Sequence, residues 1–423
     1  MSVKIQLPYG KEKVFAELPT HRLVFVVKPK DFPGVEDDEE EIRRAFRNPV
    51  GTPRISELVR PGQRVVIVAD DLTRVTPCRK IIPIILDELN AAGVKDENIK
   101  LIIGLGTHRP MTRNEIVHRF GKQVVDRIEV MNHTPFDKGN LAYLGRLASG
   151  IPLWVNKEFL EGDVKIVVGN VVPHCFGGFS AGAKGVLPGI CGEETTGMLH
   201  LTGARITVDR LIGRVENPLR RDMEEAARIV GLDMIVNTVL TRERRIAGVF
   251  VGDFVKAHRE AVKIVEKIYI EEVPKEADIV IASSYPADIE YYQGIKGVFA
   301  SYRAVKKGGT IILLTPCPEG IAQTHPAIAK YASLPSKEID RIAKEEKIED
   351  PCGVACAMVH AQQREKAHLI FVSEGLTREM CNSLGVEKAE SLDEALELAL
   401  KRHGKEATIG VITESDILAL VRE

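Results

Sequence analysis

Short apolar runs rich in β-branched residues alternate with helix-like stretches along this chain, and this alternation restricts the fold more than any other feature. Such runs are typical of strands buried on both faces of a sheet. Helices are predicted at 78–92 and 112–121, the second with Thr112 and Glu115 at capping-box spacing. The repetition predicts parallel pairing with helices on both faces. In the first part of the chain the strands are predicted at 64–69, 99–104 and 163–169.

A second set of strands is predicted later in the chain, and a helical pattern over 253–269 connects the two sets. A chain of 423 residues is too long for one ordinary core. We therefore expect an α/β protein of two domains, each with a mainly parallel sheet flanked by helices. The first domain would cover 1–270, ending in the connecting helix, and the second 271–423, with its last residues able to pack back on the first. The strands of the second set are predicted at 277–282, 310–314, 368–372 and 408–412.

The charge and composition are those of a globular protein, with a formal net charge of −2, 28% charged residues and 44% hydrophobic residues. No block of Lys and Arg favours nucleic acid as a partner. No apolar run approaches the roughly 20 residues of a membrane span, and the N-terminus lacks a signal-peptide pattern. The seven cysteines are scattered, which fits reduced thiols better than a disulfide framework. We expect a cytoplasmic protein with neither nucleic acid nor membrane as a partner, and the sequence leaves the oligomeric state open.

Reactive side chains follow the first two predicted strands, at the edge where α/β sheets bind ligands. Asp71, Thr73 and Arg74 stand at the start of a helix, where a guanidinium can grip phosphate or carboxylate. A capped helix start with a surface ion pair explains these three residues equally well. His108 follows the second strand and is a candidate acid, base or ligand. The competing interpretation of His108 is a loop histidine that binds a backbone carbonyl.

The third predicted strand leads into residues 173–184, which we call the Lys184 segment. Three glycines in it allow backbone N–H groups to approach an anion, and Ser180 adds a donor. The segment also contains His174. Because no Gly-Lys-Ser/Thr occurs there, it is not a standard nucleoside triphosphate loop. We interpret the Lys184 segment as an anion-binding site rather than as a flexible connector.

Other candidates lie further along the chain. His200 follows a helical stretch and taken alone is more typical of a surface or core position. Tyr292, Gln293 and Lys296 follow the first strand of the second domain and could close over a ligand, although a capped surface helix explains them as well.

A metal site is conceivable at Cys352, Cys356 and His360, which are spaced four residues apart. The stretch around them is small and apolar. We therefore interpret it as a buried helix face with free thiols.

In their order along the chain, these motifs resemble the nickel-dependent lactate racemase family of 2-hydroxy acid racemases and epimerases. Each motif is weak alone, but the ordered set is specific and spans both predicted domains. The motifs are Asp71-Leu72-Thr73-Arg74, Gly106-Thr107-His108, Pro173-His174, Gly178-Phe179-Ser180 through Lys184, Pro188-Gly189, His200 and Gln293-Gly294-Ile295-Lys296.

The resemblance implies a nickel pincer nucleotide, a pyridinium-3-thioamide-5-thiocarboxylic acid mononucleotide with nickel, in an active site in the interdomain cleft. Lys184 would be its covalent attachment and would be a free amine in an apoprotein. His200 would be a nickel ligand, and Phe176 would lie against the pyridinium ring. Proteins that mature the cofactor would be partners. The other cofactor-binding residues would be Asp71, Thr73, Arg74 and Ser180.

The implied reaction interconverts the stereoisomers of a 2-hydroxy acid, lactate or a related acid, at C2 through hydride abstraction and a 2-keto acid. His108 and His174 would be the two acid/base residues, because the two enantiomers present their hydroxyl groups differently. A zinc hydrolase built on His108, His174 and His200 is one alternative, although the spacing is unusual for zinc. A non-catalytic nucleotide-binding protein is another. The substrate-binding residues would be Arg74, Tyr292, Gln293 and Lys296.

Ala181 and Ala183 depart from the family pattern. Many members have Gly at the first position and a larger residue at the second. The departure leaves Lys184 in place and makes the size of the pocket, and therefore the substrate, an open question.

Overall fold

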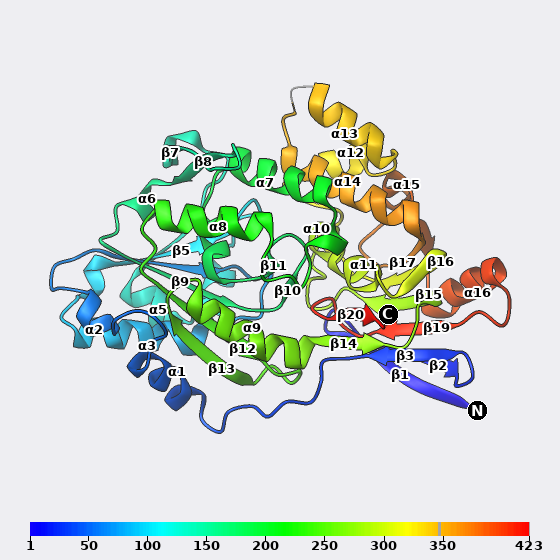
Figure 1. Cartoon of the computed structure of the whole chain (residues 1–423), viewed down its shortest axis with the longest axis horizontal. Coiled ribbons are helices and arrows are strands. Elements are labelled where there is room, and N and C mark those ends of the chain that lie inside the picture. Colours follow the sequence, from blue (N-terminus) through cyan, green and yellow to red (C-terminus); the bar gives the residue numbers. More distant parts are fainter. Residues whose placement is uncertain (346–347, 423) are drawn as a thin grey trace. The chain divides into compact units, whose positions relative to one another are not determined.

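The structure is a computed structural model that describes residues 1–345 and 348–422, and the chain folds into two compact units (Figure 1). The N-terminal unit comprises Asp31–Leu199 and Arg214–Ile268. The C-terminal unit comprises Met1–Lys30, His200–Gly213 and the chain from Tyr269 onward. The division after Ile268 lies close to the expected boundary at 270. The expected domain 1–270 nevertheless differs from the N-terminal unit, because the first 30 residues and His200–Gly213 belong to the other unit.

A six-stranded sheet with the order β13-β12-β9-β4-β5-β6 forms the core of the N-terminal unit. Its neighbours pair in parallel except β12 and β13, which are antiparallel. The three strands predicted for this region are β4, β5 and β9. The strands are β4 (Val65–Asp70), β5 (Ile99–Gly104), β6 (Glu129–Asn132), β9 (Val164–Asn170), β12 (Met234–Leu240) and β13 (Ile246–Gly252).

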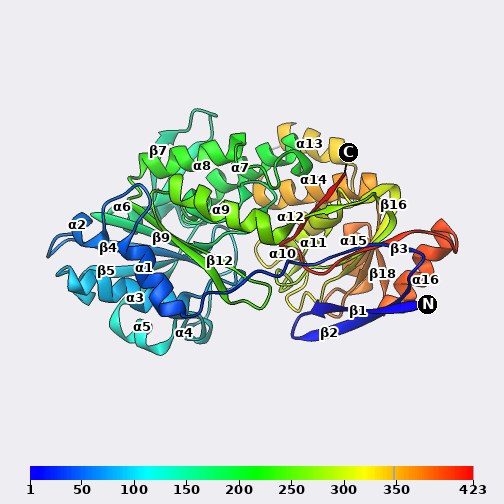
Figure 2. The same cartoon turned by 60° about the horizontal axis from the view of Figure 1, so that its bottom comes forward.

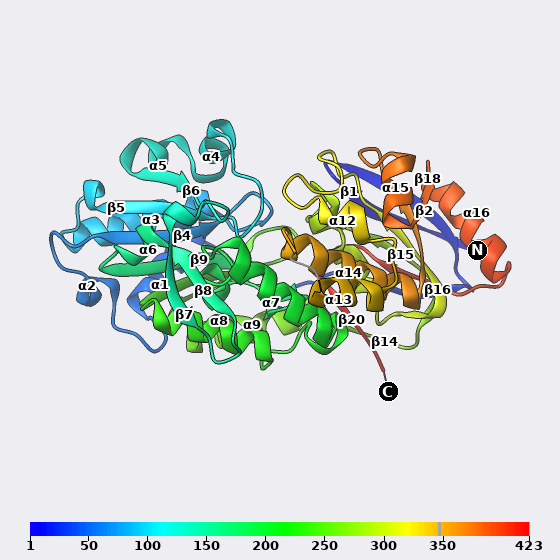
Figure 3. The same cartoon turned by 90° about the horizontal axis from the view of Figure 1, so that it is seen from above.

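Helices cover both faces of this sheet, as the alternation of apolar runs predicts. Alternate residues of the strands pack with α1 to α5 in one apolar core, and α8 and α9 lie on the opposite face (Figures 1 and 3). The expected capping box of α4 is present, with reciprocal hydrogen bonds between Thr112 and Glu115. The helices are α1 (Asp38–Arg47), α2 (Ile55–Leu58), α3 (Cys78–Ala91), α4 (Arg113–Phe120), α5 (Lys122–Arg127), α6 (Lys157–Leu160), α8 (Pro218–Ile229) and α9 (Lys256–Tyr269).

The strand order places a topological switch point between β4 and β9. The chain runs from β4 outward through β5 and β6 and returns to the other side of β4 for β9 and β12. Ligands of open α/β sheets bind at such a point, beyond the carboxyl ends of the strands. The loops after β4, β5 and β9 meet at this edge of the sheet. Two short antiparallel pairs accompany the sheet, β7 (Leu141–Arg146) with β8 (Pro152–Asn156) and β10 (Pro173–His174) with β11 (Gly178–Phe179).

The C-terminal unit contains a second six-stranded sheet, entirely parallel, with the order β18-β17-β16-β15-β19-β3. The N-terminal strand β3 joins it because β19 offers a free edge for pairing. The last strand, β20 (Leu418–Val421), pairs with β14 (Ile270–Val273) of the same unit. The sheet strands are β3 (Leu23–Val27), β15 (Ala277–Ser283), β16 (Val305–Leu314), β17 (His368–Val372), β18 (Glu387–Ala389) and β19 (Ile409–Ile412).

A hairpin of β1 (Ser2–Tyr9) and β2 (Glu12–Pro19) packs with α16 on one face of this second sheet (Figure 2). Helix α7 (Glu193–Ile206) begins in the N-terminal unit and ends in the C-terminal unit. No helix within 1–345 and 348–422 is both long and apolar enough to cross a membrane. The other helices of the unit are α10 (Tyr291–Gly294), α11 (Lys296–Ser301), α12 (Ala327–Tyr331), α13 (Ser336–Glu345), α14 (Pro351–Lys366), α15 (Arg378–Leu384) and α16 (Leu392–His403).

Candidate active site

Asp71 and His108 form a buried hydrogen-bonded pair at the carboxyl ends of β4 and β5. Oδ2 of Asp71 lies 2.6 Å from Nδ1 of His108, and the two side chains are 4% and 15% exposed. Burial acts to raise the pKa of the Asp71 carboxyl, but the charge and hydrogen bond of His108, the charge of Arg74 and the hydrogen bond from Thr73 hold it well below its usual range. An ionised carboxylate can only accept, so His108 carries a hydrogen on Nδ1.

Thr73 and Arg74 complete a local network around Asp71. The backbone N–H and the hydroxyl of Thr73 donate to Oδ1 of Asp71 at 3.1 and 2.5 Å. Nη1 of Arg74 donates to Oγ1 of Thr73 at 2.7 Å. Both carboxylate oxygens of Asp71 are therefore engaged within the protein. Asp71, Thr73 and Arg74, which follow β4 together, therefore form one hydrogen-bonded network.

Arg119 on α4 also belongs to this region. It donates from Nη1 to the carbonyl of Arg74 at 2.7 Å and from Nη2 to Oδ1 of Asp70 at 2.5 Å. Oδ2 of Asp70 in turn accepts from the hydroxyl of Thr76 at 2.6 Å. Arg119 thus holds the segment after β4 from the side of α4. An arginine near the end of an amphipathic helix resembles an ordinary surface residue, so the sequence offers no signal for this role.

His174 lies after β9 and is oriented by the backbone that follows it. The N–H groups of Phe176 and Gly177 donate to its Nδ1 at 3.3 and 3.2 Å. Because a backbone N–H can only donate, Nδ1 of His174 is an acceptor, and the neutral ring carries its hydrogen on Nε2. The side chain of Phe176, the predicted platform for the cofactor ring, is 8% exposed.

The two histidines therefore differ in what their Nε2 atoms can do. Neutral His108, with its hydrogen on Nδ1, has a lone pair on Nε2 and can accept a proton there. Neutral His174 has a hydrogen on Nε2 and can donate it. Their strands, β5 and β9, flank β4, so the two loops start about 10 Å apart. An acid and a base on either side of a switch point suit a reaction that removes a proton at one position and returns it at another.

Two glycines of the Lys184 segment are required by packing. A Cβ on Gly178, which has φ +72°, would lie 1.9 Å from the carbonyl oxygen of Arg214. A Cβ on Gly182, with φ +60°, would lie 2.8 Å from the ring of His258. Gly178 and Gly182 thus let the segment pack closely against neighbouring chain. This packing requirement is a reason for the two glycines that the sequence interpretation, the approach of an anion to the backbone, does not include.

Ser180 uses its hydroxyl group within the protein. Oγ donates to the carbonyl of Asn170 at 2.7 Å and accepts from the N–H of Val172 at 2.9 Å, and the residue is 3% exposed. Since a hydroxyl has one hydrogen, Ser180 in this conformation shapes the segment rather than offering a donor to a ligand. Ser180 would therefore contribute to cofactor binding indirectly, through the shape of the segment.

Lys184 is a partly buried amine on the short 3-10 turn Gly182–Gly185. Burial and the positive charges of Arg74 and Arg220 lower the pKa of Lys184 to about 7, against the opposite effects of Cys175 and Asp71. A substantial fraction of the amine is therefore neutral near pH 7, and only the neutral amine is nucleophilic. The same cations make the surroundings of Lys184 electropositive, which favours a phosphate-bearing ligand.

His200 lies on α7, in the stretch of the chain that belongs to the C-terminal unit. Within residues 1–345 and 348–422, no three His, Cys, Asp or Glu side chains are grouped as metal ligands. The zinc hydrolase, the alternative built on His108, His174 and His200, would need three such ligands at one site. A lone histidine suits a metal whose other donors arrive with a cofactor.

The residues predicted to reach in from the second domain are positioned by buried neighbours in the C-terminal unit. Nζ of Lys296 donates to Oε1 of Gln293 at 2.8 Å, as expected for their spacing. The ring of Tyr292 lies 4.6 Å from the ring of His325, measured between centroids. Nδ1 of His325 lies 2.8 Å from Oδ1 of Asp350.

The stretch with Cys352, Cys356 and His360 is a buried face of α14, as interpreted from the sequence. Nε2 of His360 donates to the carbonyl of Leu384 at 2.7 Å, which leaves Nδ1 to accept the hydroxyl hydrogen of Tyr291 at 2.6 Å. His360 thus anchors Tyr291, the first residue of α10, from the core.

Comparison with known proteins places this geometry in a family context. The family model described as the lactate racemase N-terminal domain matches residues 9–208, and that of the lactate racemase C-terminal domain matches 272–418. The chain is 31% identical to lactate racemases of Lactiplantibacillus plantarum (97% of this chain, 98% of that one) and of Thermoanaerobacterium thermosaccharolyticum (99% of each).

Two solved structures resemble the fold. The lactate racemase apoprotein of T. thermosaccharolyticum matches over 100% of both chains with a TM-score of 0.88 and 31% identity. A Thermotoga maritima protein with 20% identity matches in fold over 92% of this chain and 100% of that one, with a TM-score of 0.74.

Proposed function

This chain belongs to the lactate racemase family and is an isomerase of the racemase type, and on that basis we propose that it inverts C2 of a 2-hydroxy acid, with lactate as the first candidate substrate. The observation that carries the proposal is the pair of differently protonated histidines beyond β5 and β9. Nε2 of neutral His108 can accept a proton, and Nε2 of neutral His174 can donate one. Because the family consists of racemases, membership argues against the alternative of a non-catalytic nucleotide-binding protein.

The residues present fit a nickel pincer nucleotide. Lys184, with a pKa of about 7, offers an amine that can be attached covalently. His200 would be the protein ligand of nickel, and Phe176 would lie against the pyridinium ring. When bound, such a cofactor would supply the hydride acceptor that protein side chains lack.

The protein's own side chains would handle the proton and the carboxylate of the substrate. Nε2 of His108 would take the hydroxyl proton of one enantiomer as hydride leaves C2, and the planar 2-keto acid would then reorient. When hydride returns to the other face of C2, Nε2 of His174 would give a proton to the oxygen. Arg74 holds the substrate carboxylate during the turn, because a guanidinium binds carboxylate through two parallel hydrogen bonds.

Tyr292, Gln293 and Lys296 are proposed as the remaining substrate-binding residues. The hydrogen bond from Lys296 to Gln293 fixes the position of the ammonium group. An ammonium group suits the carboxylate common to all 2-hydroxy acids. The half-buried ring of Tyr292 suits recognition of the variable group on C2.

The test is stereochemical. Protein matured with its cofactor is incubated with single enantiomers of lactate and of other 2-hydroxy acids, and the products are separated by chiral chromatography. We expect each accepted acid to approach an equal mixture of enantiomers from either side. If no 2-hydroxy acid is interconverted, the proposal is wrong. For the attachment, mass spectrometry should find the cofactor adduct on the native chain and none on Lys184→Ala.

A further inference from the structure

Arg220 is a fully buried cation that binds the backbone of the Lys184 segment. It lies in the first turn of α8 and is 1% exposed. Its Nε donates to the carbonyl of Gly177 at 3.0 Å, its Nη1 donates to the carbonyl of Ala181 at 3.2 Å, and its Nη2 donates to the carbonyl of Phe179. One guanidinium thus holds three alternate peptide units of the segment.

Neighbouring side chains hold Arg220 and the segment in the same way. Oδ1 of Asn217 caps α8 by accepting from the N–H of Arg220 at 2.9 Å. Nε2 of His258 donates to the carbonyl of Ser180 at 2.9 Å, and Arg259 donates to Nδ1 of His258 at 3.1 Å. His258 is therefore neutral, and burial together with the charge of Arg220 holds its pKa well below the usual value. Side-chain donors consequently occupy the carbonyls of residues 177, 179, 180 and 181.

Within the described part of the chain, no carboxylate forms an ion pair with Arg220. The carboxylate of Glu224 is bound instead by Arg259 at 2.7 Å. Burial lowers the pKa of Arg220 to about 10, so it remains a cation at neutral pH. A buried charge without a counter-ion is unfavourable unless hydrogen bonds compensate it, and the side-chain hydrogen bonds of Arg220 go to the Lys184 segment. The placement of Arg220 therefore calls for a role beyond packing.

Ala181 is the strained point of the segment. Its φ of 57° and ψ of −160° fall in a region that is occupied almost only by glycine. Such a conformation persists only where the surroundings enforce it. The carbonyl of Ala181 accepts from both Nη1 of Arg220 and the N–H of Lys184, the latter at 3.2 Å. The turn that carries Lys184 begins directly at this residue.

We propose that Arg220 is the positioning residue of the Lys184 segment: its three hydrogen bonds hold Ala181 in the strained conformation and thereby set the position of the Lys184 amine. The inference rests on the proposed function in one respect, the attachment of the cofactor to Lys184. Arg220 also acts by charge. The groups that bear on Lys184 are the cations Arg74 and Arg220, which favour its neutral form, and Cys175 and Asp71, which oppose it.

Three variants separate the geometry of Arg220 from its charge. Arg220→Lys keeps the charge and loses the forked donor set, and Arg220→Gln loses both. Arg221→Gln is the matched control, because Arg221 is the exposed neighbour on the same helix. Circular dichroism establishes that each variant is folded. If Arg220→Gln does not fold, Arg220→Lys decides the geometric part of the proposal.

The first measurement is amide hydrogen exchange of a peptide that covers residues 175–185, in the apoprotein. We expect exchange to be at least about tenfold faster in both Arg220 variants, because about one net hydrogen bond is lost. Exchange in Arg221→Gln should be unchanged. Adding Ala181→Gly to Arg220→Lys should slow the exchange again, because glycine adopts this conformation without strain. Exchange equal to that of Arg221→Gln in both Arg220 variants would overturn the proposal.

The second measurement is the pH dependence of Lys184 acetylation by a pulse of acetic anhydride, read by peptide mass spectrometry. The amine forms a C–N bond to the acetyl carbon, acetate leaves and the amine proton passes to the buffer. We expect a midpoint near 7 in the native chain, in Arg221→Gln and in Arg220→Lys. In Arg220→Gln the midpoint should rise by about half a pH unit or more, because a nearby positive charge is lost. An unmoved midpoint would exclude the charge effect.

Loading with matured cofactor then distinguishes the positioning role of Arg220 from the proposed attachment of the cofactor to Lys184. We expect the Lys184 adduct to form on the native chain and on Arg221→Gln, and to fall at least about tenfold in Arg220→Lys, in keeping with the loosened segment. Normal loading of Arg220→Lys would overturn the positioning role. If the native chain forms no adduct while the exchange differences hold, the proposed cofactor attachment is wrong and the positioning by Arg220 stands.

Discussion

Oδ2 of Asp71 lies 2.6 Å from Nδ1 of His108, although the two residues are 37 positions apart in the chain. The pair forms because β4 and β5 are neighbours, so the loops that follow them meet. The carboxylate fixes the tautomer and orientation of the imidazole and stabilises its protonated form. Thr73 and Arg74 keep that carboxylate ionised. The geometry makes Asp71 a positioning residue for the proposed base.

Removing the charge of Asp71 should impair catalysis without unfolding the protein. Asp71→Asn keeps the size of the side chain but no longer stabilises protonated His108. We expect kcat to fall about 10- to 10⁴-fold, the range for loss of a positioned base. Steady-state kinetics of the matured enzyme measure the change. Asp126→Asn, at an exposed position, is the control, and equal kcat values for the two variants would contradict the role of Asp71.

The two histidines should have opposite tautomers in the apoprotein. Nitrogen-15 chemical shifts of labelled histidine report which ring nitrogen carries the hydrogen. We expect the hydrogen on Nδ1 in neutral His108 and on Nε2 in neutral His174, because Asp71 accepts from the first ring and backbone N–H groups donate to the second. His108→Gln and His174→Gln assign the signals. The same tautomer in both rings would contradict the different proton roles.

Lys184 should destabilise the apoprotein increasingly as the pH falls from about 10 to 7, and by a constant amount below pH 7. Its pKa is about 7 in the folded chain and about 10.4 in an unfolded one, so between these values the unfolded state binds the extra proton. The free energy of unfolding therefore increases as the pH rises from about 7 to 10. We expect Lys184→Met to raise Tm most at pH 7 and below, with the gain fading toward pH 10.

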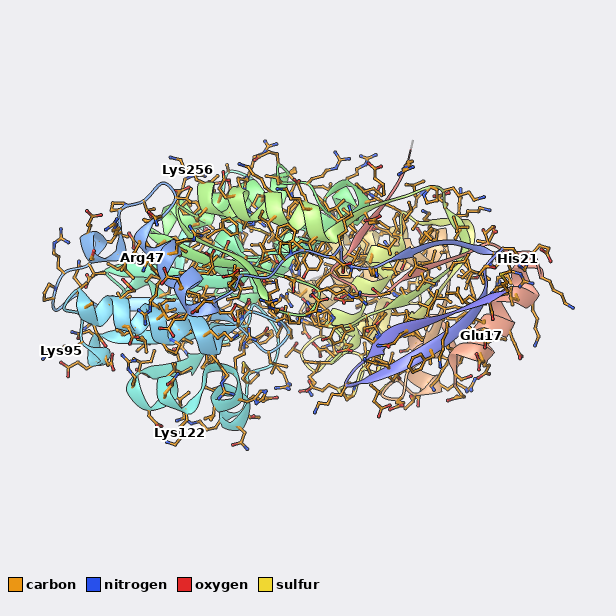
Figure 4. All side chains as sticks on the ribbon, turned by 90° about the horizontal axis from the view of Figure 1, so that it is seen from below. Glu17, His21, Arg47, Lys95, Lys122 and Lys256 are labelled. Carbon is orange, nitrogen blue, oxygen red and sulfur yellow. The ribbon has the colours of Figure 1, made fainter. Side chains whose placement is uncertain are left out.

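The control for this pH profile is Lys95→Met. The side chain of Lys95 is 77% exposed and points outward in the N-terminal unit (Figure 4). Its replacement should leave a Tm difference that does not vary between pH 6 and about 9. If the Tm difference for Lys184→Met is as independent of pH as that for Lys95→Met, the pKa of Lys184 is not lowered as described.

Tyr291→Phe should destabilise the C-terminal unit by about 1–3 kcal/mol, because it leaves the buried Nδ1 of His360 without its donor. Urea unfolding measures the change. Since Tyr291 begins α10, which is only four residues long, we also expect KM to rise more than kcat falls. Tyr143→Phe is the control, since Tyr143 is 49% exposed. Equal stability of the two variants would show that the His360 contact contributes nothing.

Ala181→Gly should stabilise the protein, which is unusual for a change to glycine. Relief of about 1–3 kcal/mol of backbone strain exceeds the roughly 0.5–1 kcal/mol of added chain entropy. We therefore expect a gain of up to about 2 kcal/mol in urea unfolding. Ala148→Gly, at an exposed position with ordinary φ, should lose stability instead. Destabilisation by Ala181→Gly would show that the residue is not strained.

Much of the architecture could be read from local pattern. Strands buried on both faces demand apolar runs, so β4, β5, β9 and the main strands of the second sheet stand out in the sequence. The rule that ligands bind beyond carboxyl ends of parallel strands led directly to Asp71, His108 and His174. Patterns of this kind work because a strand or a helix imposes its period on consecutive residues.

Local sequence patterns do not indicate which distant segments pair with one another. The sequence pattern of β3 would be the same whichever sheet the strand joined. Its pairing with the free edge of β19 is what brings it into the C-terminal unit. Arg119 and Arg220 occupy helices where an arginine is usually exposed, so nothing local marks them as buried.

Residue type and order in the chain established the family, the strands and the reactive groups. Folding settled how those groups act: which nitrogen of each histidine carries the hydrogen, why Gly178 and Gly182 are glycines, and how a buried arginine holds the segment before Lys184. The reason is that a side chain's chemistry is intrinsic, whereas its pKa, tautomer and hydrogen-bond partners depend on neighbours that are remote in sequence and meet only in the folded protein.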